Sequence, residues 1–394
     1  MRMRQAVFVC GVMAKTSRIF VGAYFGGSAD EVDAALVKLA GSGEAMTVRQ
    51  THCVQHAVDD ELREGLRSAS TGRARRTVDL VRLGRGAGEA LADACEAVMK
   101  AARVRAHRIA GIGVIGRTVG YARPGGAEKH AATLELAWPA IVARRVGAAT
   151  VAGFAETDLA AGGLGGPLWA WPDWLMFRDE RLSRVVVHLA SVATITFVGS
   201  AAAPGDVVAY DTGPGTALID CVARALFDRD FDADGAIAAR HKVSEPLLNE
   251  VLAGEYFHRP PPKRMTMGNW SNATGVRLEM MAQKHHCQDG DLLATLCELT
   301  ARSVATAVLG LTERPHEVIL TGGGAMNIHL AGRIRKLLSP CSTYTSERYG
   351  LGIRAHGATA AAVLAAARID GLAAHCPNAT GADEPKVLGA MWGG

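Results

Sequence analysis

The sequence contains no paired cysteines and no long apolar segment. Its eight cysteines lie far apart, with no CxxC pair and no zinc-finger spacing, which favours reduced, buried thiols over a disulfide framework or a zinc site. No stretch approaches the roughly 18 apolar residues of a membrane span. The apolar run at 6–10 is followed by Lys15 and Arg18 rather than by a small-residue cleavage site. We therefore expect a cytoplasmic protein.

A strong charge of one sign is also absent. The 43 basic and 39 acidic residues leave a net charge of +4 and are spread along the whole chain. A field of one sign is what favours nucleic acid or a membrane surface as partner. The composition therefore predicts a small-molecule partner, with no nucleic acid and no membrane. The run His285, His286 and Cys287 is predicted to be a surface loop rather than a metal site, because adjacent side chains point apart.

The chain is long and contains several glycine-bearing turns. With 394 residues, of which 49% are hydrophobic, it exceeds the usual size of one hydrophobic core, so two domains are expected. Three glycine-bearing turns, at 11–17, 211–215 and 322–327, each follow an apolar strand. No GxxxxGK[ST] motif is present, which excludes a Walker-type phosphate loop.

Hydrophobic periodicity and β-branched residues predict the remaining secondary structure. Helices are predicted at 29–40, 87–103, 137–146, 216–227, 292–309 and 356–369. Strands are predicted at 6–10, 19–25, 109–114, 207–210 and 317–320, with a strand pair around 185–198. The arginine-rich segment 63–86 is predicted to be a surface linker and the tail 373–394 to be loosely ordered.

The three glycine turns together indicate a nucleotide site. A kinase without a Walker loop needs one loop for the γ-phosphate, one for the inner phosphates and one for the adenosine, across a cleft between two domains. A glycine turn before a helix presents backbone N–H groups where phosphate binds well. One such turn alone is usually a plain tight turn, so the prediction depends on finding three.

Several longer motifs carry a resemblance to a known family. GFAETDLAAGGLGGPL at 153–168 and DTGPGTALID at 211–220 are followed by DADGAIA, PPPK, DLLATLCELTA and GGGAMN. In this order and spacing, from Gly11 to about Ala366, the chain resembles the anhydro-N-acetylmuramic acid kinases, whose pattern includes DFRxxDxAxGGQGAPL and DTGPGN.

The resemblance implies an α/β fold: a two-domain, actin-like ATPase (sugar kinase/Hsp70/actin) with an interdomain cleft. The first domain would span 1–130 and be joined by a C-terminal helix at about 355–372. The second would span 131–354 and hold the nucleotide loops, with a tail at 373–394. Homodimers are common in the resembled family, so a homodimer is expected by analogy.

The activity implied by the resemblance uses ATP and Mg²⁺ to open a 1,6-anhydro sugar with water while the γ-phosphate is placed on O6. Asp158 matches the general base of that family, although an isolated Asp would cap the following turn. Asp211 would reach Mg²⁺ through water or form an Asx-type turn. Both alternatives stay open.

The other implied contacts divide into two groups. Nucleotide and phosphate contacts are implied for Gly11, Thr16, Ser17, Asp211, Thr212, Gly213, Pro214, Gly215, Gly322, Gly323, Gly324 and Asn327. Substrate contacts are implied for Arg117, Gly162, Gly163 and Pro167.

The sugar side departs from the family pattern. When the first turn, GxMSGTSxDGxD, is matched to GVMAKTSRIFVG at 11–22, two aspartates become Ile19 and Gly22. GSHGQT becomes GVIGRT at 113–118, NIGGIANIT becomes HLASVATIT at 188–196, and a glutamate of the C-terminal helix falls at Gly357. Unpaired polar groups on a muramic sugar would cost roughly 1–3 kcal/mol each. We therefore predict a kinase acting on a different small, sugar-like molecule; the alternative is a nucleotide-binding pseudokinase that serves as a regulatory or partner subunit.

Overall fold

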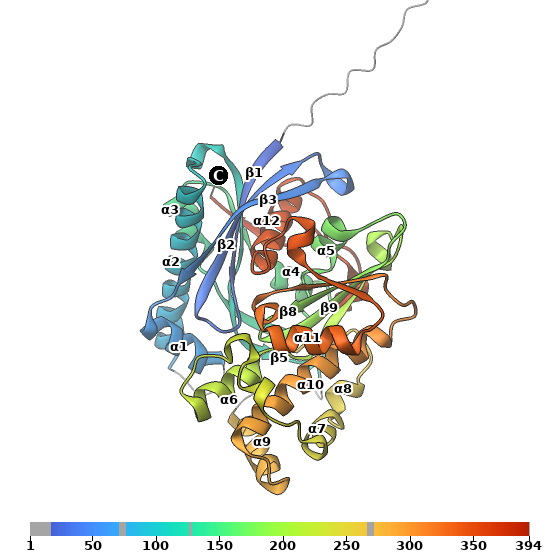
Figure 1. The fold of residues 1–394 in the computed structure, drawn as a ribbon. Helices are drawn as coiled ribbons and strands as arrows, with labels where there is room; N and C mark the ends of the chain where they lie inside the picture. The colour runs from blue at the N-terminus through green and yellow to red at the C-terminus, as the bar shows by residue number, and fades with distance from the viewer. Residues whose placement is uncertain (1–16, 71–75, 126–127, 266–271, 394) are drawn as a thin grey trace, which may run out of the picture.

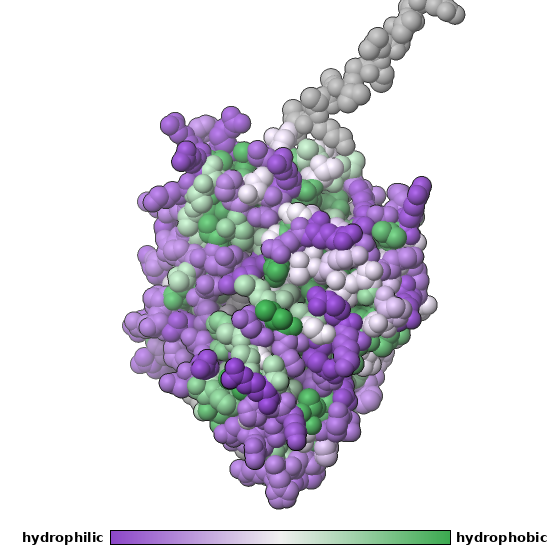
Figure 2. Space-filling view, viewed as in Figure 1, coloured by the Kyte–Doolittle hydropathy of each residue, from purple (hydrophilic) through white to green (hydrophobic). Residues whose placement is uncertain are grey.

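A computed structural model describes residues 17–70, 76–125, 128–265 and 272–393. Two sheets with their helices form two lobes, the first at the upper left and the second below and to the right in Figure 1. The face shown in Figure 2 is mostly polar, with apolar side chains in small patches. The apolar clusters of the two lobes lie inside, as expected of a chain of this length.

The first sheet has six strands in the order β13-β7-β4-β1-β2-β3. These strands are β1 Ser17–Phe25, β2 Glu31–Ala40, β3 Thr47–Ala57, β4 Ile109–Ile115, β7 Thr150–Ala152 and β13 Ala390–Trp392. The helices α2 (Thr77–Ala101) and α12 (His356–Ile369) both contact β1 and β2. A two-stranded sheet, β5 (Arg117–Ala122) with β6 (Ala132–Leu136), follows β4.

The second sheet has five strands in the order β10-β9-β8-β11-β12. These strands are β8 Arg184–Leu189, β9 Val192–Val198, β10 Val208–Pro214, β11 Glu317–Thr321 and β12 Ser342–Thr345. Around it lie α5 Ala170–Phe177, α6 Ala217–Phe227, α7 Glu245–Leu252, α8 Glu255–His258, α9 Asn272–Lys284, α10 Asp289–Leu309 and α11 Ile328–Leu337.

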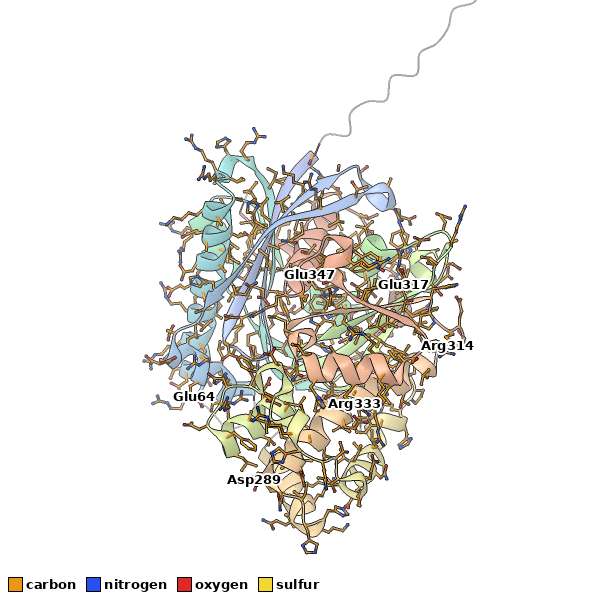
Figure 3. All side chains as sticks on the ribbon, viewed as in Figure 1. Glu64, Asp289, Arg314, Glu317, Arg333 and Glu347 are labelled. Carbon is orange, nitrogen blue, oxygen red and sulfur yellow. The ribbon has the colours of Figure 1, made fainter. Side chains whose placement is uncertain are left out.

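Helix α10 is the core helix of this lobe. By length and composition it could cross a membrane, but 78% of its apolar window is buried inside the protein. Its buried Glu298 pairs with Arg333 of α11, which Figure 3 labels, at 2.8 Å. The ion pair fixes α11, and therefore the turn before it, against the core.

Helix α12 joins the two lobes. One apolar cluster contains Phe20 of the first sheet, most of α12 and Val198 of the second sheet. The helix lies directly on β1 and β4, because a Cβ at Gly22 or Gly113 would meet its backbone oxygens within 2 Å. Glycine is therefore required at both positions for the close approach.

Two sequence predictions in the first lobe are wrong. The segment predicted as a helix at 29–40 is strand β2, whose residues Val32–Val37 are all buried. A strand covered on both faces is apolar throughout and loses the alternation that identifies strands. The segment 63–86 is not a linker: it contains the end of α1 (Asp60–Ser70), which buries Leu66, and the start of α2.

Residues beyond the expected limit of the first domain take part in its sheet. Strand β7 pairs with β4, and β13 pairs with β7, so residues beyond 130 complete the first sheet. The tail 373–394 is not loose as far as it is described, since His375, Cys376 and Leu388 are buried in it. The pairing of β13 and the burial of these side chains order a segment that its composition alone predicted to be loosely ordered.

Candidate functional site

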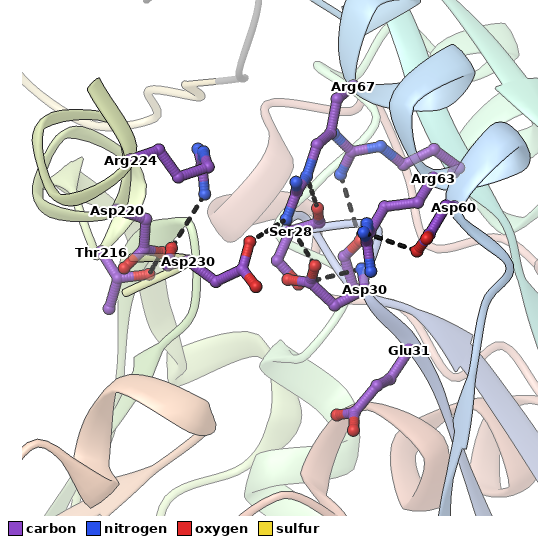
Figure 4. Close-up of polar contacts among 12 residues, drawn as sticks. Ser28, Asp30, Glu31, Asp60, Arg63, Arg67, Thr216, Asp220, Arg224 and Asp230 are labelled. Atoms are coloured by element: carbon purple, nitrogen blue, oxygen red, sulfur yellow. Dashed lines mark hydrogen bonds and ion pairs between the residues drawn. The ribbon is translucent and has the colours of Figure 1, made fainter. Parts of the chain in front are cut away.

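The turn between β1 and β2 lies in the gap between the lobes. Arg67 of α1 donates from Nε to the Ser28 carbonyl at 2.9 Å and forms an ion pair with Asp30. The same guanidinium lies 3.7 Å from Asp230 of the second lobe. Figure 4 shows this contact, with Thr216 and Asp220 on the facing side. The hairpin and the start of α6 thus form opposite walls of one site.

This hairpin corrects the placement of the first phosphate turn. Residues 22–33, GAYFGGSADEVD, fit GxMSGTSxDGxD with both aspartates present, as Asp30 and Asp33. Gly11 and Thr16 lie outside the described residues, and Ser17 is the exposed first residue of β1. The turn that joins two paired strands at the gap is therefore 26–30, and the predicted loss of both aspartates came from the wrong register.

The segment 211–215 forms the buried end of β10 and the bend into α6. Both carboxylate oxygens of Asp211 accept hydrogen bonds, from Thr194 Oγ1 at 2.7 Å and from the Met265 N–H at 2.8 Å. Burial raises the pKa of this carboxyl, against those two hydrogen bonds. Each oxygen of Asp211 thus accepts one hydrogen bond, and its predicted role beside Mg²⁺ through water stays a prediction.

Asp30 and Asp220 are two further carboxylates that could lie beside a water-coordinated Mg²⁺. Burial, and to a smaller extent the charge of Asp30, raises the pKa of Asp220 to about 6, while a hydrogen bond from Thr216 opposes the shift. Among the described residues no three metal-ligating side chains converge. Mg²⁺ keeps several waters and needs only one or two protein carboxylates. Two carboxylates that repel each other across the gap suit a water-coordinated Mg²⁺.

The second and third glycine turns lie side by side at the end of β8. A Cβ at Gly215 would come within 1.9 Å of the Ala190 oxygen, and one at Gly322 within 2.5 Å of the Leu189 oxygen. Gly324 faces Leu189 and Thr216 just as closely, whereas a Cβ at Gly323 would meet nothing within 4 Å. The turn therefore presents its open side at Gly323. Asn327 caps α11, since its Oδ1 accepts from the Leu330 N–H at 2.9 Å.

The remaining members of the second turn are held inside the lobe. Thr212 donates from Oγ1 to the Ala193 carbonyl at 3.3 Å, and the Pro214 carbonyl accepts from Thr300 Oγ1 at 3.0 Å. A Cβ at Gly213 would come within 3.0 Å of the Phe257 ring. These contacts fix the bend and leave its backbone in one conformation.

A cavity lies beside the hairpin, and its lining includes Gly27 of the β1–β2 turn. Of the predicted site residues, Arg117, Pro167 and Asp211 line it. The cavity also has an aromatic wall, in which Trp169 lies 5.5 Å from the Tyr24 ring and 5.4 Å from the His188 ring, centre to centre. The guanidinium of Arg117 is not free for a two-pronged contact, because its Nη atoms donate to the Gly26 carbonyl and to Ser70 Oγ at 3.1 and 3.0 Å.

Comparison with known proteins assigns the family. The sequence pattern described as "Anhydro-N-acetylmuramic acid kinase" matches residues 18–394. The proteins of that name from Gloeobacter violaceus and Salinibacter ruber are each 34% identical to this chain, over 94% and 96% of its length and over 97% and 96% of their own. The chain belongs to the anhydro-N-acetylmuramic acid kinase family. The predicted α/β fold of the actin-like ATPase type and the enzyme class, an ATP-dependent sugar kinase, are confirmed by this membership.

Solved structures overlap less closely. A ROK family glucokinase from Streptomyces griseus in complex with glucose and AMPPNP is 12% identical, with a TM-score of 0.37 over 88% of this chain and 99% of that one. The activator of the 2-hydroxyisocaproyl-CoA dehydratase from Clostridium difficile is 9% identical, with a TM-score of 0.45 over 89% and 96%. Overlaps at this level support no assignment by themselves.

The family's glycine-rich motif forms a closed turn in this chain. Asp158, on α4 (Phe154–Ala160), is fully buried, and its oxygens accept from the Gly165 N–H at 2.5 Å and from His375 Nε2 at 2.6 Å. A Cβ at Gly163 would lie 2.3 Å from this carboxylate, and one at Gly162 would lie 3.0 Å from Asp383. Asp158, Gly162 and Gly163 are not among the cavity's lining residues, and the contacts of Asp158 are those of a carboxylate that caps the turn; its predicted role as general base stays a prediction.

Two polar side chains of this region escaped the sequence analysis. His375 comes from the tail predicted to be loose and carries no motif. Glu135 lines the cavity from β6, where alternation of exposed and buried residues gave it the pattern of an ordinary strand residue. Gly357, which replaces the family's glutamate, lies against Tyr24, because a Cβ at position 357 would be 2.5 Å from the Tyr24 ring. Tyr24 thus occupies the space into which the family's glutamate would project.

Proposed function

We propose that this chain is an ATP-dependent kinase that phosphorylates an anhydro-sugar or a related small molecule in an acceptor cavity altered from the family pattern. The observation that carries the proposal is the pair of walls at the gap, with Asp30 in the hairpin on one side and the α6 start with Asp220 on the other. An acceptor placed in the adjoining cavity would lie next to the phosphates.

Each wall has a separate task in this proposal. The backbone of 26–30 and the bend at 211–216 would hold the phosphates, since glycine turns and helix starts present N–H groups. The turn at 322–324 would receive the adenosine. Asp30 and Asp220 would hold Mg²⁺ through water, and the ion would neutralise charge on the transferring group when bound. Trp169 and Tyr24 would contact one face of the acceptor ring.

The nucleotide assignment predicts that Gly323→Trp weakens ADP binding by at least about 10-fold, equal to 1.4 kcal/mol. The indole would fill the open side of the turn, where the base would lie. Gly332→Trp is the matched control, because a Cβ at Gly332 also meets nothing within 4 Å but lies on α11, away from the turn. Calorimetric titration measures both; equal affinities of Gly323→Trp and the parent would refute the assignment.

The altered cavity predicts slow use of anhydro-N-acetylmuramic acid. Ile115 and Ala190 line the cavity where the family pattern has histidine and glycine, and Tyr24 fills the place of the family's glutamate. Coupled ADP release should give turnover below about 1 per second with this sugar, under the median of enzymes. Faster phosphorylation would show that other residues replace the lost contacts.

A pseudokinase remains the second candidate, favoured by the engagement of both Asp158 oxygens. The presence of Asp30 and Asp33 removes one of its original supports. ADP binding without turnover of any anhydro-sugar or free sugar would establish it in place of the kinase.

A further inference from the structure

We propose that His375, in the C-terminal tail, is a positioning residue that orients the Asp158 carboxylate as the general base beneath the glycine-rich turn. The inference rests on the proposed kinase function and on the base role that the family resemblance implies for Asp158, and it adds a residue to them. Its basis is a set of buried contacts in which each ring nitrogen of His375 has a defined partner.

The hydrogen-bond pattern fixes which ring nitrogen of His375 carries the hydrogen. The Lys386 N–H donates to Nδ1 at 3.2 Å, and a backbone N–H can only donate, so Nδ1 offers its lone pair. The hydrogen of the neutral ring is then on Nε2, which lies 2.6 Å from Asp158 Oδ1 and 3.2 Å from Thr380 Oγ1. Nε2–H therefore donates to the carboxylate. Because Nδ1 is already engaged, the ring has no free lone pair with which to take a proton itself.

The Asp158 carboxylate is held from both sides. The Gly165 N–H donates to Oδ2 at 2.5 Å, while His375 engages Oδ1. Each carboxylate oxygen has a second lone pair, so these two contacts orient the group and still leave it able to accept a proton. No lysine or arginine among the described residues forms an ion pair with Asp158. His375 thus orients the carboxylate without compensating its negative charge.

The tail segment that carries His375 also supports the glycine-rich turn. The Leu164 N–H donates to the Thr380 carbonyl at 2.9 Å, and the Asp383 N–H donates to the Ala161 carbonyl at 2.9 Å. The imidazole and the turn are therefore fixed to one segment of chain. This arrangement keeps the donor, the carboxylate and the turn in a constant relation to one another.

The turn above Asp158 belongs to the cavity wall. Gly165, whose N–H contacts the carboxylate, lines the cavity. Tyr121 lines it too, and burial raises the pKa of this phenol, against the charge of Arg264. The charges of Asp211 and then Asp158 add to the rise. The carboxylate thus lies one peptide group behind the wall, close enough for its charge to act in the cavity. A base must be within hydrogen-bond reach of the proton that it removes, so its direction matters.

The test compares His375→Gln with His375→Met in the full chain, because the two new side chains have almost the same size. Glutamine keeps an N–H group that can donate to Asp158, and methionine does not. With ATP and either 1,6-anhydroglucose or anhydro-N-acetylmuramic acid, His375→Met should lower kcat by about 10-fold to 100-fold, the cost of misplacing a reacting group. His375→Gln should keep kcat within about 3-fold of the parent. Acceptor KM and ADP affinity should be equal in both variants, and ADP titration counts the folded molecules.

A double-mutant cycle shows whether His375 acts through Asp158. Asp158→Asn alone should lower kcat by about 100-fold or more, the usual contribution of a general base. Adding His375→Met to Asp158→Asn should change kcat by less than about 3-fold, because the group that the ring positions is no longer a base. Equal losses from His375→Met in the two backgrounds would show that the ring acts independently of Asp158 and would overturn the proposal.

Two further variants lie in the same tail. Asn378→Ala removes an exposed side chain that donates to the Gly205 carbonyl, and it should leave kcat unchanged. Lys386→Pro deletes the N–H that engages His375 Nδ1 while the Asp158 contact keeps both of its side chains, and it should lower kcat about 3-fold or more. Lys386→Ala keeps that N–H and should match the parent. The Lys386 pair decides the question if the His375 variants do not fold, and equal kcat in the pair would then overturn the positioning role.

The outcomes separate this inference from the proposed function. An active parent in which His375→Met and His375→Gln have the same kcat would overturn the role of His375 alone. An Asp158→Asn variant that keeps the parent kcat would do the same, because the positioned group would not be the base. A parent that binds ADP but phosphorylates neither of the two acceptors nor free sugars would overturn the kinase function, and this inference with it.

Discussion

Asp30→Asn should reduce turnover by about 100-fold to 1,000-fold, the usual loss when a preorganised charge is removed from the reacting group. The carboxylate stands in the β1–β2 turn and faces Asp220 across the gap, where we place the water-coordinated Mg²⁺ and the γ-phosphate. Asparagine keeps the shape of the side chain but not its charge. The Mg²⁺ that binds the phosphate would therefore lose one of its two carboxylates. Steady-state ADP release at saturating ATP and acceptor measures the effect.

Two controls separate charge loss from distortion of the hairpin. Asp60→Asn changes a carboxylate that is 87% exposed and, among the described residues, forms an ion pair with Arg63 alone, so it should leave turnover unchanged. Arg67→Gln removes the cation that pairs with Asp30 while the carboxylate remains, and it should cost less than Asp30→Asn. Equal losses in both variants would show that the ion pair positions the hairpin and that Asp30 has no separate role.

Asp158→Ala should lower the free energy of unfolding by about 3 kcal/mol, because it removes the acceptor of two buried hydrogen bonds. The Gly165 N–H loses its acceptor, and the buried His375 ring keeps only its longer contacts with Thr380 Oγ1 and the Lys386 N–H, both at 3.2 Å. Urea denaturation measures the loss. The loss of stability should be largest at the contact between the tail and the glycine-rich turn, where His375 meets Asp158.

A matched control lies in the same tail. Glu384 is exposed and, within the described part of the chain, forms an ion pair with Lys386 alone, so Glu384→Ala should change the free energy of unfolding by less than about 0.5 kcal/mol. If Asp158→Ala is as stable as this control, the Asp158–His375 contact contributes nothing to the fold and the capping alternative is wrong, which favours the role of Asp158 as general base.

Helices and glycine turns with strong local signals could be predicted from the sequence. Helix α12 spans the predicted 356–369 because its alanine-rich run has no competing pattern. The glycine turn at 322–327 lies, as predicted, between β11 and α11. Both features depend on neighbours in the chain, which a sequence records directly.

Features set by contacts between distant segments could not be predicted. Strand β2 is apolar because helices cover both of its faces, and the resulting pattern also suits a helix. The register of the first phosphate turn became clear only when β1 and β2 paired around 26–30. The cavity position of Glu135 depends on the Gly116 corner, 19 residues away, and the Asp158–His375 contact joins residues 217 apart.

The bridging position of α12 has a consequence for how the protein is made. Strands β1, β2 and β4 are translated long before residue 356, and the helix that covers one face of them emerges near the end of synthesis. Until then, a nascent chain carries an apolar β-surface beside the ribosome, and such surfaces aggregate or engage chaperones. A stalled chain ending before α12 should therefore be retained by the chaperone network, whereas release of the remaining residues allows both lobes to close in a single late step.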